Sequence, residues 1–443
     1  MNVLRLVAAY GLLLAACADD VAGGGGDPAN DAASANPDPV PDDAAVDATL
    51  ATDASADATL SADAASSDAS TGDGAPPDGP AVDAGDAGAF PRLGVYTVKV
   101  DGGGLTLLVD PGTHDLSHVR GASNGWLVAT RYGQDTDLNG LAMEDEAPLG
   151  AHYDGTQVVA FERSNPAVQF VVSGVTSGGF SCNPSWTDDG RVLFLWNAPG
   201  APITNARLMR ATFGTLPQVI NLETLTTPSE LIIPVDPHQR GPSDGGTIVF
   251  SATFEQAPGA WMRPLWKMPA GGAFTMAQVG FIGCPVCPLQ GGCCKAATPD
   301  GVRGTNDARI SHGGGDVVWM QQHPDIVATV GAQSFNPYRQ SKRPLDGGPQ
   351  VELNPPLTPP TTQHAYAEWR PDDKELTYWS IEIDQNVLRH FLWTMAPDGS
   401  NRRKIPLPPE LCPQHPSYLS AHEIVFNAWR GASGDNNCDV AKL

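Results

Sequence analysis

A strand–turn–strand pattern recurs between residues 91 and 443, and it limits the fold more than any other feature of the chain. Short runs rich in β-branched and aromatic residues, such as VYTVKV (95–100), VLFLW (192–196) and LTYWS (376–380), alternate with turns rich in Gly, Pro and Asp. No long stretch has the 3.6-residue period of an amphipathic helix. Many short strands between regular turns indicate an all-β sandwich, barrel or propeller.

Two copies of the pattern are sharp, NPSWTDDGRVLFLW around Trp186 and YAEWRPDDKELTYW around Trp369, and a third, HPSYLSAHEIVFNAW, stands near the C-terminus. The Asp-Gly pair in such a unit supplies the positive φ of a tight hairpin. The copies resemble the TolB-type, WD40-like propeller repeat. The resemblance implies an all-β six-bladed β-propeller of four-stranded antiparallel blades over residues 91–443. The last copy lacks its outermost strand, and we expect the opening segment 95–109 to complete it.

Six residues open the first strands of the six copies: His118, Asn183, His238, Asp307, Tyr366 and His415. The innermost strands of a propeller line its central channel, so we expect these residues to ring one mouth of the channel. Three imidazoles and a carboxylate suit a transition metal, and oligogalacturonate lyases, which are also propellers, have a His-rich metal site in a comparable place. The TolB-type resemblance supports another interpretation, because His at this position often makes structural hydrogen bonds.

The segment 135–146 matches the loop pattern of calcium-binding EF-hands, D-x-[DN]-x-[DN]-G-x₅-E. The ligands of a Ca²⁺ ion would be the side chains of Asp135, Asp137, Asn139 and Glu146 and the carbonyl of Leu141. Strands rather than helices flank this segment. The sequence therefore predicts either a structural Ca²⁺ site or a solvated acidic loop between strands.

Seven cysteines follow position 17, and an exported chain favours disulfides between them. Cys412 and Cys438 bracket the last copy of the repeat and form the pair that we expect first. The other candidates are Cys182 and a cluster made of Cys284, Cys287, Cys293 and Cys294. The cluster could instead hold Zn²⁺, although adjacent cysteines suit a tetrahedral site poorly.

The first seventeen residues have the features of a bacterial lipoprotein signal peptide. Arg5 precedes a nine-residue apolar run, which is too short to span a bilayer as a helix. The run ends in Leu14-Ala15-Ala16-Cys17, which resembles the lipobox, and the resemblance implies that the Cys17 thiol receives a diacylglyceryl anchor. Ala18 after the cysteine favours the outer membrane as destination, facing the periplasm or the surface.

Residues 18–90 contain 22 Ala, 16 Asp and no Lys, Arg or Glu, so about two thirds of the chain's net charge of −24 lies in this segment. Such a composition cannot bury enough apolar surface to offset its ordering entropy, and we expect a disordered tether. The acidic balance also argues against nucleic acid as a partner, because phosphate contacts need a basic surface. No glycine motif for nucleotides occurs in a βαβ context.

The sequence contains no convincing catalytic set. The G-x-S-x-G match at 121–125 lies at a predicted hairpin turn rather than at the strand-to-helix elbow of a hydrolase. We therefore expect a non-enzymatic cell-envelope lipoprotein whose propeller is a binding scaffold for a protein or cell-wall partner. The alternative is a metal-dependent lyase or hydrolase that acts on acidic saccharides at the channel mouth.

Unusual loops predict which face of the propeller carries the recognition surface. The acidic segment 135–146 and the cysteine segment 284–294 both fall on the side where one blade connects to the next. The Asp189-Gly190 hairpin turns on the other side. Because loops on a rigid scaffold carry function, we expect the recognition surface on the face of the two unusual segments.

Overall fold

A computed structural model describes most of the C-terminal part of the chain. The described residues are 93–110, 114–121, 124–132, 156–173, 179–199, 201, 205–226, 232–257, 260–271, 280–283, 295–296, 305–322, 328–330, 333–335, 337–354, 362–384, 387–430 and 438. Among these residues there is no helix long and apolar enough to cross a membrane.

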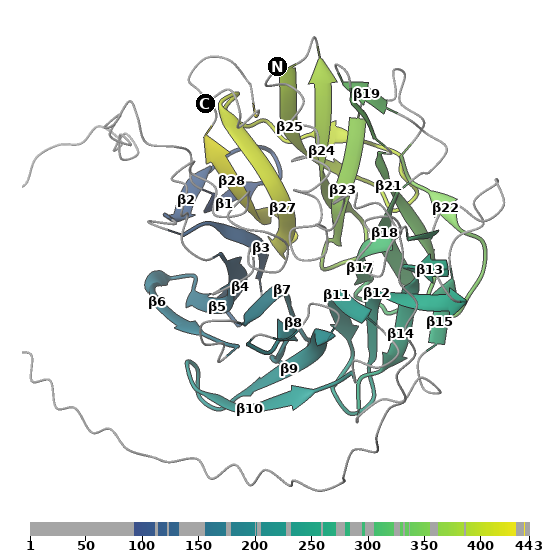
Figure 1. The fold of residues 1–443 in the computed structure, drawn as a ribbon. Helices are drawn as coiled ribbons and strands as arrows, with labels where there is room; N and C mark the ends of the chain where they lie inside the picture. The colour runs from purple at the N-terminus through teal and green to yellow at the C-terminus, as the bar shows by residue number, and fades with distance from the viewer. Residues whose placement is uncertain are drawn as a thin grey trace, which may run out of the picture. The chain divides into compact units, whose positions relative to one another are not determined.

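The described strands form six antiparallel blades that follow one another around a centre, as Figure 1 shows, together with one separate two-stranded sheet. The first blade contains β3 (Leu116–Gly121), β4 (Trp126–Arg131), β5 (Gln157–Glu162) and β6 (Asn165–Val171). The second contains β7 (Phe180–Trp186), β8 (Val192–Asn197), β9 (Arg207–Phe213) and β10 (Val219–Thr224). The third contains β11 (Ile232–Arg240), β12 (Thr247–Ala257), β14 (Leu265–Pro269) and β15 (Gly280–Gly283), with β13 (Ala260–Met262) and β16 (Lys295–Ala296) extending one side of β12.

The remaining three blades have the same order of strands. The fourth contains β17 (Thr305–Ile310), β18 (Asp316–Gln322), β21 (Tyr338–Pro344) and β22 (Val351–Glu352), with a hairpin of β19 (Ala328–Val330) and β20 (Gln333–Phe335) between β18 and β21. The fifth contains β23 (Thr362–Trp369), β24 (Leu376–Asp384), β25 (Val387–Met395) and β26 (Arg403–Lys404). The sixth contains β27 (Leu411–Ser420), β28 (Glu423–Arg430), β1 (Gly94–Lys99) and β2 (Thr106–Val109).

The protein is therefore an all-β, six-bladed β-propeller, as the sequence pattern predicts. The expected closure of the ring is also confirmed, because the order of the sixth sheet is β2-β1-β28-β27. The six residues of β1 pair antiparallel with β28, from Gly94 opposite Ala428 to Lys99 opposite Glu423. In Figure 1 the dark N-terminal strands accordingly lie beside the yellow C-terminal ones.

The hydrophobic core is divided among the contacts between neighbouring blades. One cluster, for example, joins Val128 and Val158 of the first blade to Trp186, Phe194 and Met209 of the second. Similar clusters lie at the other blade boundaries. The alternation of apolar residues along each strand thus buries both faces of a blade against its two neighbours.

Every innermost strand has a bulge at the same place, and this bulge determines which side chains face the centre. The register shifts between Ser117 and Arg120 in β3, and equivalent shifts occur in β7, β11, β17, β23 and β27. One residue in each bulge has a positive φ of about 50°: His118, Asn183, Asp236, Asp307, Tyr366 and His415. We call these six residues the bulge ring.

The bulge ring corrects one residue of the sequence prediction. In the third blade the ring position belongs to Asp236, and His238 lies two residues further along β11. The sequence contains a signal for this register, since Asp236-Pro237 matches Asn183-Pro184. A register that matches His238 to the histidines of the other copies is therefore wrong by two residues in the third blade.

Candidate functional site

Three residues of the bulge ring, from the first, fifth and sixth blades, pack tightly against one another. The ring therefore does not form the open channel mouth that we expected. His118, Tyr366 and His415 are at most 2% exposed. The two imidazoles stack with centroids 4.1 Å apart, and the Tyr366 ring meets His415 edge-on at 4.2 Å. Ser117 Oγ lies 3.1 Å from Nδ1 of each histidine, so the hydroxyl donates to one ring and accepts from the other.

The other half of the ring is held by hydrogen bonds between polar side chains. Asn183 Nδ2 donates to Asp236 Oδ1 at 2.8 Å, and the backbone N–H of Asp307 donates to Asp236 Oδ2 at 3.0 Å. Both carboxylate oxygens of Asp236 are thus engaged. These contacts join the second, third and fourth blades at the centre of the propeller.

A buried charge network extends from the ring. Asp307 Oδ1 forms an ion pair with Arg309 Nη2 at 2.5 Å and accepts a hydrogen bond from Arg120 Nη2 at 3.2 Å, and Arg309 Nε donates to Glu368 Oε2 at 3.2 Å. All four side chains are at most 8% exposed. Burial raises the pKa of Asp307 to about 6, against the opposing effect of the two guanidiniums. The network fixes three blades to one another by ionic contacts in a low-dielectric interior.

A cavity of about 470 Å³ lies beyond this network, and every blade contributes to its wall. The six blades contribute, in chain order, the lining residues Arg120, Ser185, His238, His312, Glu368 and Ser417. Asp188 and Gly190 of the β7–β8 hairpin also line it, as does Pro371 of the β23–β24 turn. The cavity therefore opens on the face of the Asp-Gly hairpins, opposite the face where the sequence analysis placed the recognition surface. Its size suits a small ligand or a short segment of a larger one.

His238 enters the cavity as a neutral imidazole of defined tautomer. The backbone N–H of Ile310 donates to His238 Nδ1 at 3.0 Å, so the ring proton resides on Nε2. Burial lowers the pKa of His238 well below its ordinary value, and the guanidiniums of Arg240 and Arg309 lower it further. The residue can therefore offer a fixed N–H donor to a ligand.

Arg240 connects three blades at the edge of the cavity. Its Nη1 donates to Asp188 Oδ1 at 2.7 Å, its Nε donates to the Ile310 carbonyl at 3.2 Å, and its Nη2 lies 3.1 Å from His312 Nε2. Because a guanidinium is always charged, the last contact requires an unprotonated Nε2 on His312. Partial burial and the adjacent Arg240 both lower the pKa of His312.

Sequence reasoning missed Arg120, Arg309 and Glu368, although a signal for them exists. Each lies two residues after its bulge-ring residue, so the three occupy the same place in their strands. A charged residue at the same place in three innermost strands indicates side chains directed to the polar centre.

The structure brings together Cys412 and Cys438, which form a disulfide with Cα atoms 5.6 Å apart. Cys182 is also disulfide-bonded. The calcium candidates Asp135, Asp137, Asn139, Leu141 and Glu146 lie outside the described residues. So do Cys17 and the cluster Cys284, Cys287, Cys293 and Cys294. Within the described ranges, no three His, Cys, Asp or Glu side chains are arranged to hold a metal ion.

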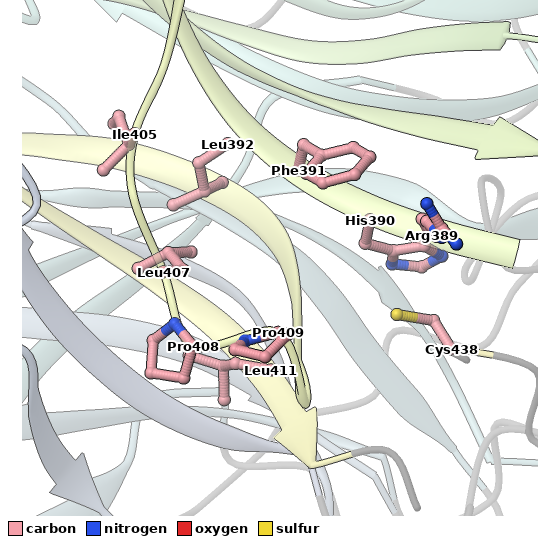
Figure 2. A pocket seen from close by; sticks show the side chains of 10 residues that line it. All are labelled: Arg389, His390, Phe391, Leu392, Ile405, Leu407, Pro408, Pro409, Leu411 and Cys438. Carbon is pink, nitrogen blue, oxygen red and sulfur yellow. The ribbon is translucent and has the colours of Figure 1, made fainter. Parts of the chain in front are cut away.

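A much smaller hollow, of about 40 Å³, lies beside the disulfide in the sixth blade. Figure 2 shows His390 and Cys438 at one end of it and Leu407, Pro408 and Leu411 at the other. Burial lowers the pKa of His390 to about 3, an effect only partly offset by the Pro413 backbone. The hollow is too small for a ligand of ordinary size, and the central cavity remains the candidate site.

The comparisons with known proteins give likeness of fold. No protein-family model and no curated protein sequence matches the chain. A solved oligogalacturonate lyase in complex with manganese is similar over 74% of this chain and 76% of its own, at 12% identity and a TM-score of 0.40.

Two further solved structures are similar in the same way. The β-propeller domain of the Trilobed protease from Pyrococcus furiosus covers 69% of this chain and 76% of its own, at 10% identity and a TM-score of 0.36. A prolyl endopeptidase covers 72% of this chain at 11% identity and a TM-score of 0.39, and this chain spans only 40% of its length. The likeness extends to the β-propeller and no further.

Proposed function

We propose that this protein is a lipid-anchored envelope protein whose propeller binds a segment of a protein or cell-wall partner in the central cavity. The observation that carries the proposal is the cavity of about 470 Å³ to which all six blades contribute. A hollow at the axis of a closed ring has a shape that many strands determine jointly, so it is preorganised for a ligand.

The groups that line the cavity favour binding over catalysis. His238 Nδ1 and His312 Nε2 already accept hydrogen bonds, from Ile310 and Arg240. Both oxygens of Glu368 also accept, from Arg309 and from the backbone of Trp369. A general base needs a free lone pair within reach of the substrate proton; the two imidazoles lack one at these nitrogens, and the charge of Glu368 is paired with Arg309. These three residues instead offer a rigid set of donors and neutralised charges.

The attachment to the membrane is a separate part of the proposal. We propose that Cys17 carries a diacylglyceryl anchor and that residues 18–90 hold the propeller away from an outer-membrane surface. Changing Cys17→Ser should abolish incorporation of labelled fatty acid and release the protein from the membrane fraction. A variant that remains unlabelled yet membrane-bound would show that another part of the chain binds the membrane.

The binding proposal is tested by site-specific photocrosslinking in intact envelopes. A photoreactive residue at Asn124, which lines the cavity, should give a discrete adduct, whereas the same residue at the exposed Lys374 should not. A second change, Pro371→Trp, places an indole at the cavity and should suppress the adduct. The matched change Lys374→Trp lies in the same turn, outside the cavity lining, and should leave the adduct intact.

The competing enzyme hypothesis is tested on the same purified protein. A lyase acting on acidic saccharides such as oligogalacturonate would release unsaturated products that absorb ultraviolet light, and a hydrolase would release new reducing ends. Either activity, if lost in Pro371→Trp and kept in Lys374→Trp, would overturn the binding proposal. Equal adducts at positions 124 and 374 would overturn it as well.

A further inference from the structure

A second hollow of about 350 Å³ adjoins the central cavity on the same face of the propeller. The two hollows have three lining residues in common: Asp188, Arg240 and His312. From this common wall the second hollow runs outward between the β11–β12 and β17–β18 turns of the third and fourth blades. We call it the glycine groove, because five of its lining residues are Gly241, Gly245, Gly246, Gly313 and Gly314.

The glycines leave the groove open toward solvent. A Cβ atom added at Gly245 or Gly314 would have no protein atom within 4 Å. At Gly246, by contrast, an added Cβ would lie 2.3 Å from the Arg240 carbonyl oxygen, so this glycine is required by the turn itself. The groove is thus a surface where another chain can approach the backbone closely.

The walls of the groove are fixed by internal hydrogen bonds. The backbone N–H of Gly241 donates to Asp188 Oδ2 at 2.8 Å, and that of Gly313 donates to Asp373 Oδ2 at 2.6 Å. The N–H of His312 donates to the other oxygen of Asp373 at 2.7 Å. These side-chain contacts bind each turn to its neighbouring blade, so the groove is preformed rather than created by a ligand.

The chemistry of the groove distinguishes between classes of occupant. Its charged residues Asp188 and Arg240 neutralise each other at 2.7 Å, which leaves no net charge to select an anion. The described part of its lining contains no Trp, Tyr or Phe against which a sugar ring could stack. Ile310 and Leu345 supply apolar contact instead, beside an exposed backbone. This combination suits the main chain of a polypeptide and its small or apolar side chains.

We infer that the site binds an extended peptide, with one part in the central cavity and the continuing chain in the glycine groove. This inference rests on the proposed function and names the class of its ligand. The peptide crosses the Arg240–His312 contact where the two hollows meet. An extended chain of about seven residues spans roughly 24 Å.

The probes for the test are linear peptides of about seven residues, selected from a random library on the full-length protein. The variant Gly245→Trp fills the groove, and its matched control is Gly315→Trp. Gly315 is equally exposed and an added Cβ there also meets no atom, yet it does not line the groove. Pro371→Trp reports on the central cavity, as above, and thermal unfolding checks that each variant is folded.

We expect selected peptides to bind about tenfold more weakly to Gly245→Trp and to Pro371→Trp, and with unchanged affinity to Gly315→Trp. Shortening a peptide from the end that lies in the groove should remove its sensitivity to Gly245→Trp alone. Peptides sensitive only to Pro371→Trp would overturn the groove inference and leave the proposed function standing. Failure to select any peptide, or binding of glycan fragments that Gly245→Trp weakens, would overturn the peptide class.

Discussion

Asp307 is the counter-charge that two buried arginines at the centre of the propeller have in common. One of its oxygens receives both guanidiniums, while Oδ2 has no hydrogen-bond partner among the described residues. Hydrogen bonds to both oxygens would stabilise the ionised form of Asp307 more than contacts to one oxygen do. Burial disfavours ionisation further. The same carboxyl is nevertheless the only anion shared by Arg120 and Arg309 in the described contacts.

Replacing Asp307→Asn should lower the free energy of unfolding by about 3 kcal/mol, because two buried guanidiniums lose their common counter-charge. Urea unfolding followed by tryptophan fluorescence measures this loss. The control is Glu423→Gln, which breaks the half-exposed pair with Arg163 and should cost less than about 1 kcal/mol. Equal losses in the two variants would show that the central network contributes no more than a surface ion pair.

The buried imidazoles give the protein a defined response to acid. Burial lowers the pKa of His390 from 6.5 to about 3. Below pH 6.5 the unfolded chain therefore binds a proton that the folded protein excludes until about pH 3. The contribution to stability is complete above pH 6.5 and is lost as the pH falls through this window. Asp307 acts in the opposite sense, because its raised pKa lets the folded protein take up a proton first.

His390→Phe isolates this effect, since Asp307 and the other histidines remain in both proteins. Between pH 6 and 4, the free energy of unfolding should fall less steeply in the variant, by about 1.4 kcal/mol per pH unit for the one proton removed. Urea titrations at several pH values measure the two slopes. Parallel slopes would mean that His390 is protonated as readily in the folded protein as in the unfolded chain.

At the scale of single elements, the bulges of the innermost strands explain what the sequence could and could not predict. The strands themselves follow from alternating apolar residues and turn signals, and these were predicted at most positions. The bulge adds one residue to the innermost strand, so the alternation of side chains changes in mid-strand and a strict period of two does not locate it. A register taken from the histidines of the other copies therefore places His238 where Asp236 lies.

The disulfide between Cys412 and Cys438 links β27 to a residue beyond β28, and the two cysteines are 26 positions apart. Closing a loop of this length removes conformational freedom from the unfolded chain, and we expect about 3 kcal/mol of stability from it. The double variant Cys412→Ala, Cys438→Ala should therefore unfold at lower urea concentration than the wild type under oxidising conditions. With dithiothreitol present, a persisting difference of the same size would contradict this account.

At the scale of the whole molecule, the ring was predictable and the position of its cavity was not. Six copies of a strand unit imply closure, and the spare N-terminal strands imply how it occurs. The open side depends instead on which side chains fill the axis. His118, Tyr366 and His415 stack in the bulge ring, whereas Ser185 and Ser417 leave space two residues further on. These side chains come from separate blades and contact one another only in the folded protein, so the sequence does not show which side of the axis they leave open.

Closure of the ring should be essential for folding. A chain that begins at Asp115 lacks β1 and β2, so the edge of β28 that faces β1 is left unpaired, and Val95 and Val98 are removed from two core clusters. We expect this chain to aggregate or to lose cooperative unfolding. A chain that begins at Ala89 retains both strands and should unfold at the same urea concentration as the full-length protein. A monomeric, cooperatively folding chain from Asp115 would show that five blades and a half suffice.

The pairing of β1 with β28 also sets the order in which the molecule can fold. Gly94 is made early in synthesis and its partner Ala428 is made near the end, so the final ladder joins residues separated by almost the whole propeller. Contacts at such separation form slowly, because loop closure precedes any gain from pairing. Until then β1 and β28 both present open edges to other chains. A nascent molecule is therefore most vulnerable to association with its neighbours just before its last blade is complete.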